Sequence, residues 1–154
     1  MSVRNDVAEI MLYEEIDPFW GIGAKQFADD VKALGNVKGI SLRINSPGGD
    51  VFDGLAIYNT LKNHSADVTV TVDGLAASIA SIIAMAGDTI SMADNAMMMI
   101  HDPWTVAVGN ADELRKTIDT LDKVKDSLVG TYSRRSGMDE NEVSDLMTAE
   151  TWLD

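Results

Sequence analysis

The sequence predicts an α/β fold in which strands and helices alternate along one chain. Apolar and polar residues alternate at residues 7–13, 37–45 and 68–72, as expected for half-buried strands. Apolar residues fall at helical spacing at residues 24–34 and 51–62, between those strands. Turns rich in glycine or polar residues separate the segments. This alternation favours parallel strands, whose carboxyl ends bring loops together into one site.

The composition fits one globular domain that needs no disulfide or structural metal ion. The 154 residues include no cysteine, which excludes thiol catalysis, cysteine zinc sites and disulfides. The net charge of -13 argues against a nucleic-acid partner. Residues 1–17 lack the pattern of a secretory signal, and the apolar run at 75–86 is shorter than the ~20 residues that span a bilayer. We therefore expect a cytoplasmic protein with no membrane partner, metal or cofactor.

The first half of the chain contains two strand–helix units. After the strand at 7–13, a loop holds Phe19 and Trp20, which we interpret as packing residues. The amphipathic helix at 24–34 ends at a Gly-Asn pair. The next strand, at 37–45, stops at the turn Ser-Pro-Gly-Gly-Asp of residues 46–50, so a glycine turn connects this strand to the following helix.

A serine occupies the change from strand-like to helix-like sequence at residues 74–81. We expect the strand to end at Gly74 and Ser78 to open a short buried helix that stops at Gly87. The first N–H groups of a helix have no intrahelical partner, so an oxyanion that forms beside Ser78 would meet hydrogen-bond donors. An N-cap or a small packing residue is the alternative interpretation of Ser78, and this segment alone favours that alternative.

A histidine follows the next pair of predicted strands. Residues 89–92 and 96–100 have strand patterns, and the three consecutive methionines of the second strand are interpreted as core residues. His101 stands at the end of that strand, two residues before a proline. A single histidine in this place is also compatible with a structural role. His64, in a polar loop, is a weaker candidate.

The last part of the chain is predicted to be mostly helical. Apolar residues at intervals of three, four or seven indicate a long amphipathic helix at residues 111–132. A shorter helix is predicted at 139–147, before the final residues 148–154. The sequence contains no internal repeat, low-complexity tract or interdomain linker.

Three motifs occur in a fixed order along the chain. They are Ser-Pro-Gly-Gly at 46–49, Gly-Leu-Ala-Ala-Ser at 74–78 and Met-Ile-His at 99–101, with 29 residues from Gly49 to Ser78 and 23 from Ser78 to His101. Together they resemble the active-site series of the Clp-type caseinolytic serine peptidases (ClpP). The resemblance extends over residues 10–154 and is greatest to the ClpP-like head maturation (prohead) proteases of tailed phages.

The resemblance implies a ClpP/crotonase-like fold with a protruding handle helix and the activity of a serine endopeptidase. It implies that Ser78 is the nucleophile and that His101 is the general base that removes its proton. The other site residues that it implies are the backbone N–H groups of Gly49 and Ile79 as the oxyanion hole, and Gly48, Asp50 and Val51 at a substrate-binding edge.

The third member of the implied triad departs from the pattern of cellular ClpP, which has an aspartate. The matching position holds Glu150, 49 residues after His101, and Asp145 is the alternative. The family continues with a further helix and strand. We therefore expect a single peptidase domain at 1–154 that lacks these elements, with Glu150 poorly held near the end of the chain.

The resemblance also implies partners. These are a peptide or protein substrate, copies of the same chain in a homo-oligomeric ring joined through the helix at 111–132, and capsid or scaffold proteins during head maturation in the host cytoplasm. It leaves an AAA+ ATPase partner open. Two alternative functions are a crotonase-like enzyme acting on acyl-coenzyme A and a catalytically silent component that binds capsid or scaffold proteins.

Overall fold

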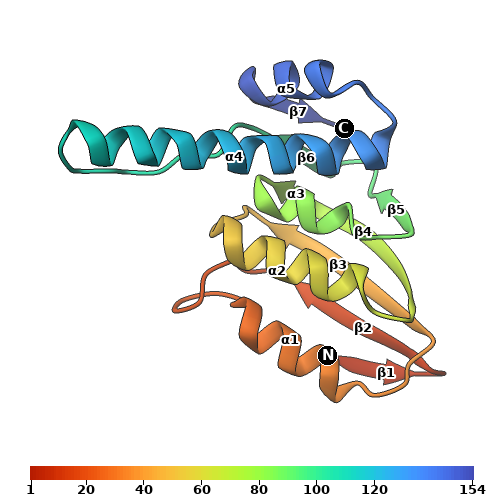
Figure 1. Cartoon of the computed structure of the whole chain (residues 1–154). Coiled ribbons are helices and arrows are strands. Elements are labelled where there is room, and N and C mark those ends of the chain that lie inside the picture. Colours follow the sequence, from red (N-terminus) through yellow and green to blue (C-terminus); the bar gives the residue numbers. More distant parts are fainter. The chain divides into compact units, whose positions relative to one another are not determined.

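The structure is a computed structural model that describes residues 1–154, and its contacts divide the chain into two compact units. Unit 1 comprises Met1–Met99 and Trp152–Asp154, and unit 2 comprises Ile100–Thr151 (Figure 1). Unit 1 combines parallel strands with helices that follow them in the chain, as the sequence predicts. The predicted α/β class is therefore confirmed.

Seven strands form one sheet, and nearly all of its residues belong to unit 1. Its strand order is β1-β2-β3-β4-β6-β7, and β5 also pairs with β4. The β1–β2 pair is antiparallel, whereas β2–β3, β3–β4, β4–β5 and β4–β6 are parallel. The strands are β1 (Ser2–Arg4), β2 (Val7–Leu12), β3 (Gly39–Ser46), β4 (Asp67–Ala77), β5 (Thr89–Met92), β6 (Met97–Ile100) and β7 (Thr151–Leu153).

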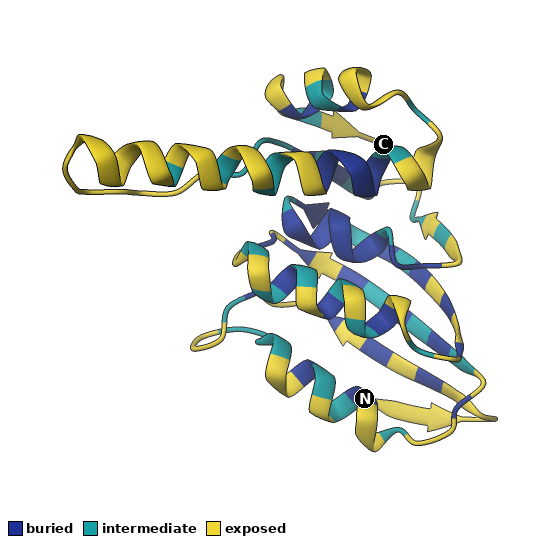
Figure 2. Cartoon of the chain, in the orientation of Figure 1, coloured by how far each residue is buried: buried dark blue, intermediate teal, exposed yellow.

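Three helices cover one face of this sheet (Figure 1). They are α1 (Ala24–Ala33), α2 (Val51–Lys62) and α3 (Ile79–Ala84), which follow β2, β3 and β4 in the chain. Right-handed connections between neighbouring parallel strands place successive helices on the same side. Along the strands, buried residues alternate with more exposed ones (Figure 2). One buried row, made of Ile10, Leu42 and Val70, crosses three strands.

A polar network joins β3 and β4 on the residues that alternate with this buried row. Arg43 forms an ion pair with Asp73 and donates from Nε to Asp73 Oδ2 over 2.9 Å. The Tyr13 hydroxyl donates to the same oxygen over 2.6 Å. Hydrogen bonding with Tyr13 and then with Asp73 raises the pKa of the Arg43 guanidinium. This network connects the carboxyl-terminal parts of neighbouring strands.

The end of β4 corrects one prediction. The strand was expected to end at Gly74 but continues to Ala77. A Cβ atom on Gly74 would lie 2.8 Å from Asn45 Oδ1, and the β3–β4 register shifts between Ile44 and Ser46 beside it. Glycine within a strand often marks a bulge or a close approach of neighbouring groups. Gly74 therefore marks the close approach of Asn45 at an irregularity of the sheet, and not the end of the strand.

The loop before α1 corrects another prediction, because Phe19 and Trp20 do not pack. Their exposed fractions are 84% and 93%. Asp17 Oδ1 accepts hydrogen bonds from both of their backbone N–H groups over 2.7 Å, and the Ile22 N–H donates to the Glu15 carbonyl over 2.9 Å. Backbone hydrogen bonds therefore close the loop while the aromatic rings face solvent.

Unit 2 contains the helices α4 (Ala111–Ser136) and α5 (Glu140–Thr148). Asn110 and Glu113 form a capping box at the start of α4, and Gly137 ends it with φ of 78°. The helix is longer than the predicted 111–132 because this glycine is the first residue that stops it. Its residues 128–132 are buried, whereas most earlier ones are exposed or half-buried (Figure 2). No helix of the chain combines the length and apolar character needed to cross a membrane.

Candidate active site

Ser78 lies at the junction of β4 and α3 in a strained backbone conformation. Its φ and ψ are 55° and -130°, a region that costs a residue with a side chain about 1–3 kcal/mol. Its N–H group donates to the Met99 carbonyl over 2.9 Å, and the Ser81 hydroxyl donates to the Ser78 carbonyl over 2.6 Å. The Ser78 side chain makes no capping hydrogen bond to α3, which is the interaction that the alternative N-cap role requires. A sharp strand-to-helix turn of this kind presents the nucleophile of α/β-hydrolases.

The backbone of Gly48 lies against Ser78. A Cβ atom built on Gly48 would be 2.8 Å from Ser78 Cβ, 2.7 Å from the Ala77 carbonyl oxygen and 3.2 Å from the Ile79 nitrogen. The φ of Gly48 is +94°, which residues with a Cβ rarely adopt. Both the conformation and the space at this position therefore require glycine. Because Gly48 has no side chain, the turn at residues 46–50 can approach Ser78 closely.

The predicted oxyanion donors lie on the two segments that meet here. Gly48 donates its N–H to Ser46 Oγ over 3.2 Å, and Asp50 donates its N–H to the Ile16 carbonyl over 2.7 Å. The Gly49 N–H lies between these two groups along the chain and donates to no backbone carbonyl. Ile79 is the first residue of α3, where N–H groups have no intrahelical acceptor. Their role as an oxyanion hole stays a prediction.

The predicted substrate-binding edge is extended only over its first residues. Gly49 forms a parallel bridge with Ile16. Asp50 instead caps α2, because its Oδ1 atom accepts the Asp53 N–H over 2.8 Å, and Val51 is the first residue of that helix. The roles of Gly48, Asp50 and Val51 in substrate binding remain predictions.

His101 and Glu150 face each other within unit 2. Their Nδ1 and Oε2 atoms are 4.0 Å apart, which is longer than a hydrogen bond. The His101 side chain is 18% exposed and that of Glu150 is 58% exposed. Glu150 has φ of 50° in the turn between α5 and β7, and its N–H donates to the Met147 carbonyl over 3.1 Å. The two side chains are therefore close enough for a small movement to join them.

The competing residues occupy other surroundings. Asp145 is exposed on α5 and forms no ion pair with a histidine. His64 Nδ1 accepts the Ala66 N–H over 3.0 Å in the turn before β4. This hydrogen bond gives His64 a structural role. The predicted serine and its backbone donors thus lie in unit 1, and the His101–Glu150 pair lies in unit 2.

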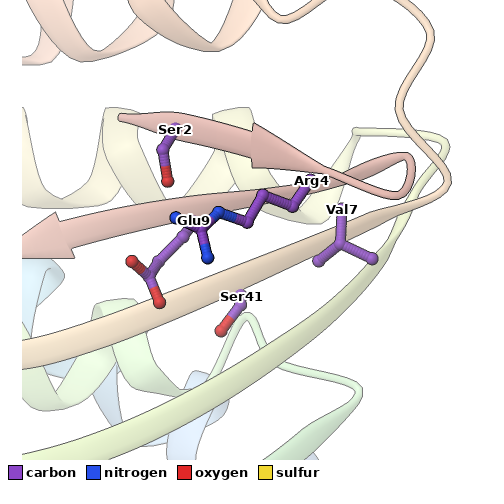
Figure 3. Close-up of a pocket in the computed structure, with 5 residues that line it drawn as sticks. All are labelled: Ser2, Arg4, Val7, Glu9 and Ser41. Atoms are coloured by element: carbon purple, nitrogen blue, oxygen red, sulfur yellow. The ribbon is translucent and has the colours of Figure 1, made fainter.

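A shallow cavity of about 400 Å³ lies elsewhere in unit 1 (Figure 3). It is at the amino-terminal ends of β2 and β3, whereas Ser78 follows the carboxyl-terminal end of β4. Its lining contains none of the predicted site residues, and no group of three His, Asp or Glu side chains in the chain is arranged to hold a metal ion. The lining residues are Ser2, Arg4, Val7, Glu9 and Ser41.

Comparison with known proteins identifies the family. The sequence matches the Clp protease family over residues 6–154. It is 36% identical over 118 residues to the ATP-dependent Clp protease proteolytic subunit of Bacteroides fragilis, covering 75% of this chain and 57% of that protein. The same subunit of Ligilactobacillus salivarius is 36% identical over 125 residues, with 76% and 64% covered. Subunit 1 of Synechococcus sp. is 39% identical over 102 residues, with 65% and 52% covered.

The chain thus spans between half and two thirds of the length of these curated relatives. The matched region contains every residue of the candidate site, from Gly48 to Glu150. From the match over nearly its whole length, we conclude that the chain belongs to the Clp protease family.

Proposed function

We propose that the protein is a serine endopeptidase in which Ser78 attacks the carbonyl carbon of a peptide bond. The observation that carries this proposal is the strained turn at Ser78, with the Gly48 backbone against it. A conformation that costs free energy is retained where the surrounding structure needs it, and such residues concentrate at active sites. Family membership makes peptide-bond hydrolysis the reaction that fits this turn best.

His101 is the proposed general base. Its neutral imidazole removes the proton of the Ser78 hydroxyl during attack, and the imidazolium then gives that proton to the leaving amine. Ser78 donates its N–H to Met99, which is two residues before His101 in the chain, and this supports the pairing.

Glu150 is the proposed orienting acid. By accepting the His101 Nδ1–H, it would fix the tautomer that leaves the other ring nitrogen for Ser78. The 4.0 Å separation must shorten by about 1 Å to form this bond. Catalytic hydrogen bonds are often long without substrate and tighten when it binds.

The backbone N–H groups of Gly49 and Ile79 are the proposed oxyanion hole. They would bind the negative oxygen of the tetrahedral intermediate, after which the carbonyl reforms and the amine leaves. Each belongs to a segment packed against the serine, and neither N–H is used by the helix or bridge beside it. Donors fixed in advance in this way stabilise the transition state without reorganisation.

We further propose a protein substrate of the capsid or scaffold class, cleaved during phage head maturation in the host cytoplasm. This proposal rests on the sequence resemblance to head maturation proteases. A homo-oligomeric ring is proposed to form through α4, where Leu114 and Ile118 lie one turn apart and are 38% and 56% exposed. An apolar stripe exposed on a helix is suited to packing against another subunit.

The test of the proposed activity is hydrolysis of a varied set of fluorogenic peptides, with acyl-coenzyme A thioesters assayed in parallel. Peptide hydrolysis that disappears in Ser78→Ala is expected. Thioester hydrolysis that survives Ser78→Ala would indicate a crotonase-like enzyme, and binding of capsid or scaffold protein without hydrolysis would indicate a silent component. For the substrate class, capsid and scaffold proteins of a tailed phage should be shortened on incubation with the wild type but not with Ser78→Ala.

A further inference from the structure

Three polar side chains form a cluster in unit 2 that the proposed reaction does not use. Lys125, from α4, donates from Nζ to Thr148 Oγ1 over 2.8 Å and to Asp102 Oδ2 over 3.0 Å. The Thr148 hydroxyl also donates to Asp102 Oδ2, over 3.2 Å. Each side chain therefore contacts the other two, and the cluster is closed.

The cluster connects the two chain segments that carry the proposed base and acid. Asp102 directly follows His101, and Thr148, the last residue of α5, is two residues before Glu150. Lys125 contacts both segments from a long helix, so it links them to the same rigid element.

The charges of the cluster depend on one another. Lys125 Nζ lies 3.0 Å from Asp102 Oδ1, an atom that is buried and accepts no well-aligned hydrogen bond. The ammonium group thus compensates a carboxylate oxygen that water does not reach. The Asp102 side chain is 38% exposed, so without the ammonium its carboxylate can turn this oxygen toward water. Because Thr148 shares the carboxylate, its contact with Asp102 would then be lost as well.

We propose that Lys125 is a positioning residue that sets the separation of His101 and Glu150 by holding Asp102 and Thr148 together. In the structure that separation is 4.0 Å, so a small displacement of either segment decides whether the pair can form its hydrogen bond. The catalytic consequence rests on the proposed function, whereas the structural link does not. Groups that orient catalytic residues from behind typically contribute about 10–100-fold to activity in metal sites, and we expect the same range here.

The kinetic test compares Lys125→Met with Lys123→Met, a change of an exposed lysine on the same helix. Lys125→Met should lower kcat for a fluorogenic peptide about 10–100-fold with KM changed less than about twofold, and Lys123→Met should change neither. In a Glu150→Gln background, Lys125→Met should have almost no further effect, because the residue it positions is already disabled. An undiminished loss in that background, or a loss expressed in KM, would overturn the proposal.

A second readout does not depend on activity and separates this proposal from the proposed function. Amide hydrogen exchange at Ala149 and Glu150, whose N–H groups donate to Asp145 and Met147, should be about tenfold faster in Lys125→Met than in Lys123→Met. Unchanged exchange would refute the link even if the enzyme were active, and faster exchange in a protein without peptidase activity would refute only the proposed function. Thr148→Val, which removes one hydroxyl, should produce a smaller change in the same direction and serves if Lys125→Met does not fold.

Discussion

Substituting Gly48 by alanine tests whether its backbone supports the reactive serine. In Gly48→Ala the new Cβ would lie 2.7 Å from the Ala77 carbonyl oxygen and 2.8 Å from Ser78 Cβ. Neither neighbour is the end of a flexible side chain, so the turn at Ser78 itself must move. Gly35→Ala is the matched control, because Gly35 also has a positive φ, of +66°, but no atom lies within 4 Å of the new Cβ.

Gly48→Ala should lose more free energy of unfolding than Gly35→Ala. A left-handed conformation costs a residue with a Cβ about 1–2 kcal/mol, and both variants should lose that much free energy of unfolding. In Gly48→Ala the carbonyl oxygen must also retreat by about 0.7 Å to reach 3.4 Å, where ordinary contact begins. Overpacking of this kind adds about 1–3 kcal/mol. Because a misplacement of about 1 Å can reduce a rate about 10²-fold, serine reactivity should fall by roughly that factor.

Urea unfolding measures the loss of free energy of unfolding, and the rate of labelling by a fluorophosphonate measures the reactivity of the serine. Labelling is compared at a temperature where both variants are folded. Gly35→Ala should label at the wild-type rate despite its loss of stability. If Gly48→Ala labelled equally fast and lost no more free energy of unfolding than Gly35→Ala, the contact with Ser78 would have no role in supporting the nucleophile.

Three further predictions concern the histidine, the acid and the assembly. His101→Ala should abolish peptide hydrolysis, because no group would then remove the proton of the Ser78 hydroxyl; the reverse result, with His64→Ala inactive and His101→Ala active, would show that the base is misassigned. Glu150→Gln should reduce turnover by up to about 10⁴-fold with circular dichroism unchanged, while Asp145→Asn should reduce it little, and near-normal turnover of Glu150→Gln would point to another acid. Native mass spectrometry should detect a multi-subunit assembly that Ile118→Lys, in the exposed part of α4, breaks apart; a stable monomer for the wild type would contradict the proposed ring.

Elements with local start and stop signals could be predicted from the sequence. The helix predicted at 51–62 has the bounds of α2, Val51–Lys62, because Asp50 caps it and a glycine turn precedes it. The strands β1 and β7 were not predicted, since three residues are too few to show a period and their pairing partners are set by the fold. The Asn5-Asp6 pair, with φ of 52° and 64°, was a turn signal that could have indicated the β1–β2 hairpin.

In the candidate site, too, local motifs could be predicted from the sequence, whereas contacts between residues far apart in the chain could not. The motifs around Gly48 and Ser78 predicted two segments that the structure packs together. Sequence reasoning did not find the Lys125 cluster, because its members are 23 and 46 residues apart and each resembles an ordinary surface residue. The hydrogen bond from Ser81 to the Ser78 carbonyl was missed for a similar reason, since a small residue in a helix has no distinctive pattern.

The most direct test of the central claim is to locate the residue that a fluorophosphonate modifies. Peptide mass spectrometry of the labelled wild type should find the adduct on Ser78, and Ser78→Ala should not be labelled. Ser81→Ala should still be labelled, because the buried Ser81 hydroxyl is engaged with the Ser78 carbonyl at 2.6 Å. An adduct on another residue, or labelling that survives Ser78→Ala, would contradict the assignment of Ser78 as the nucleophile.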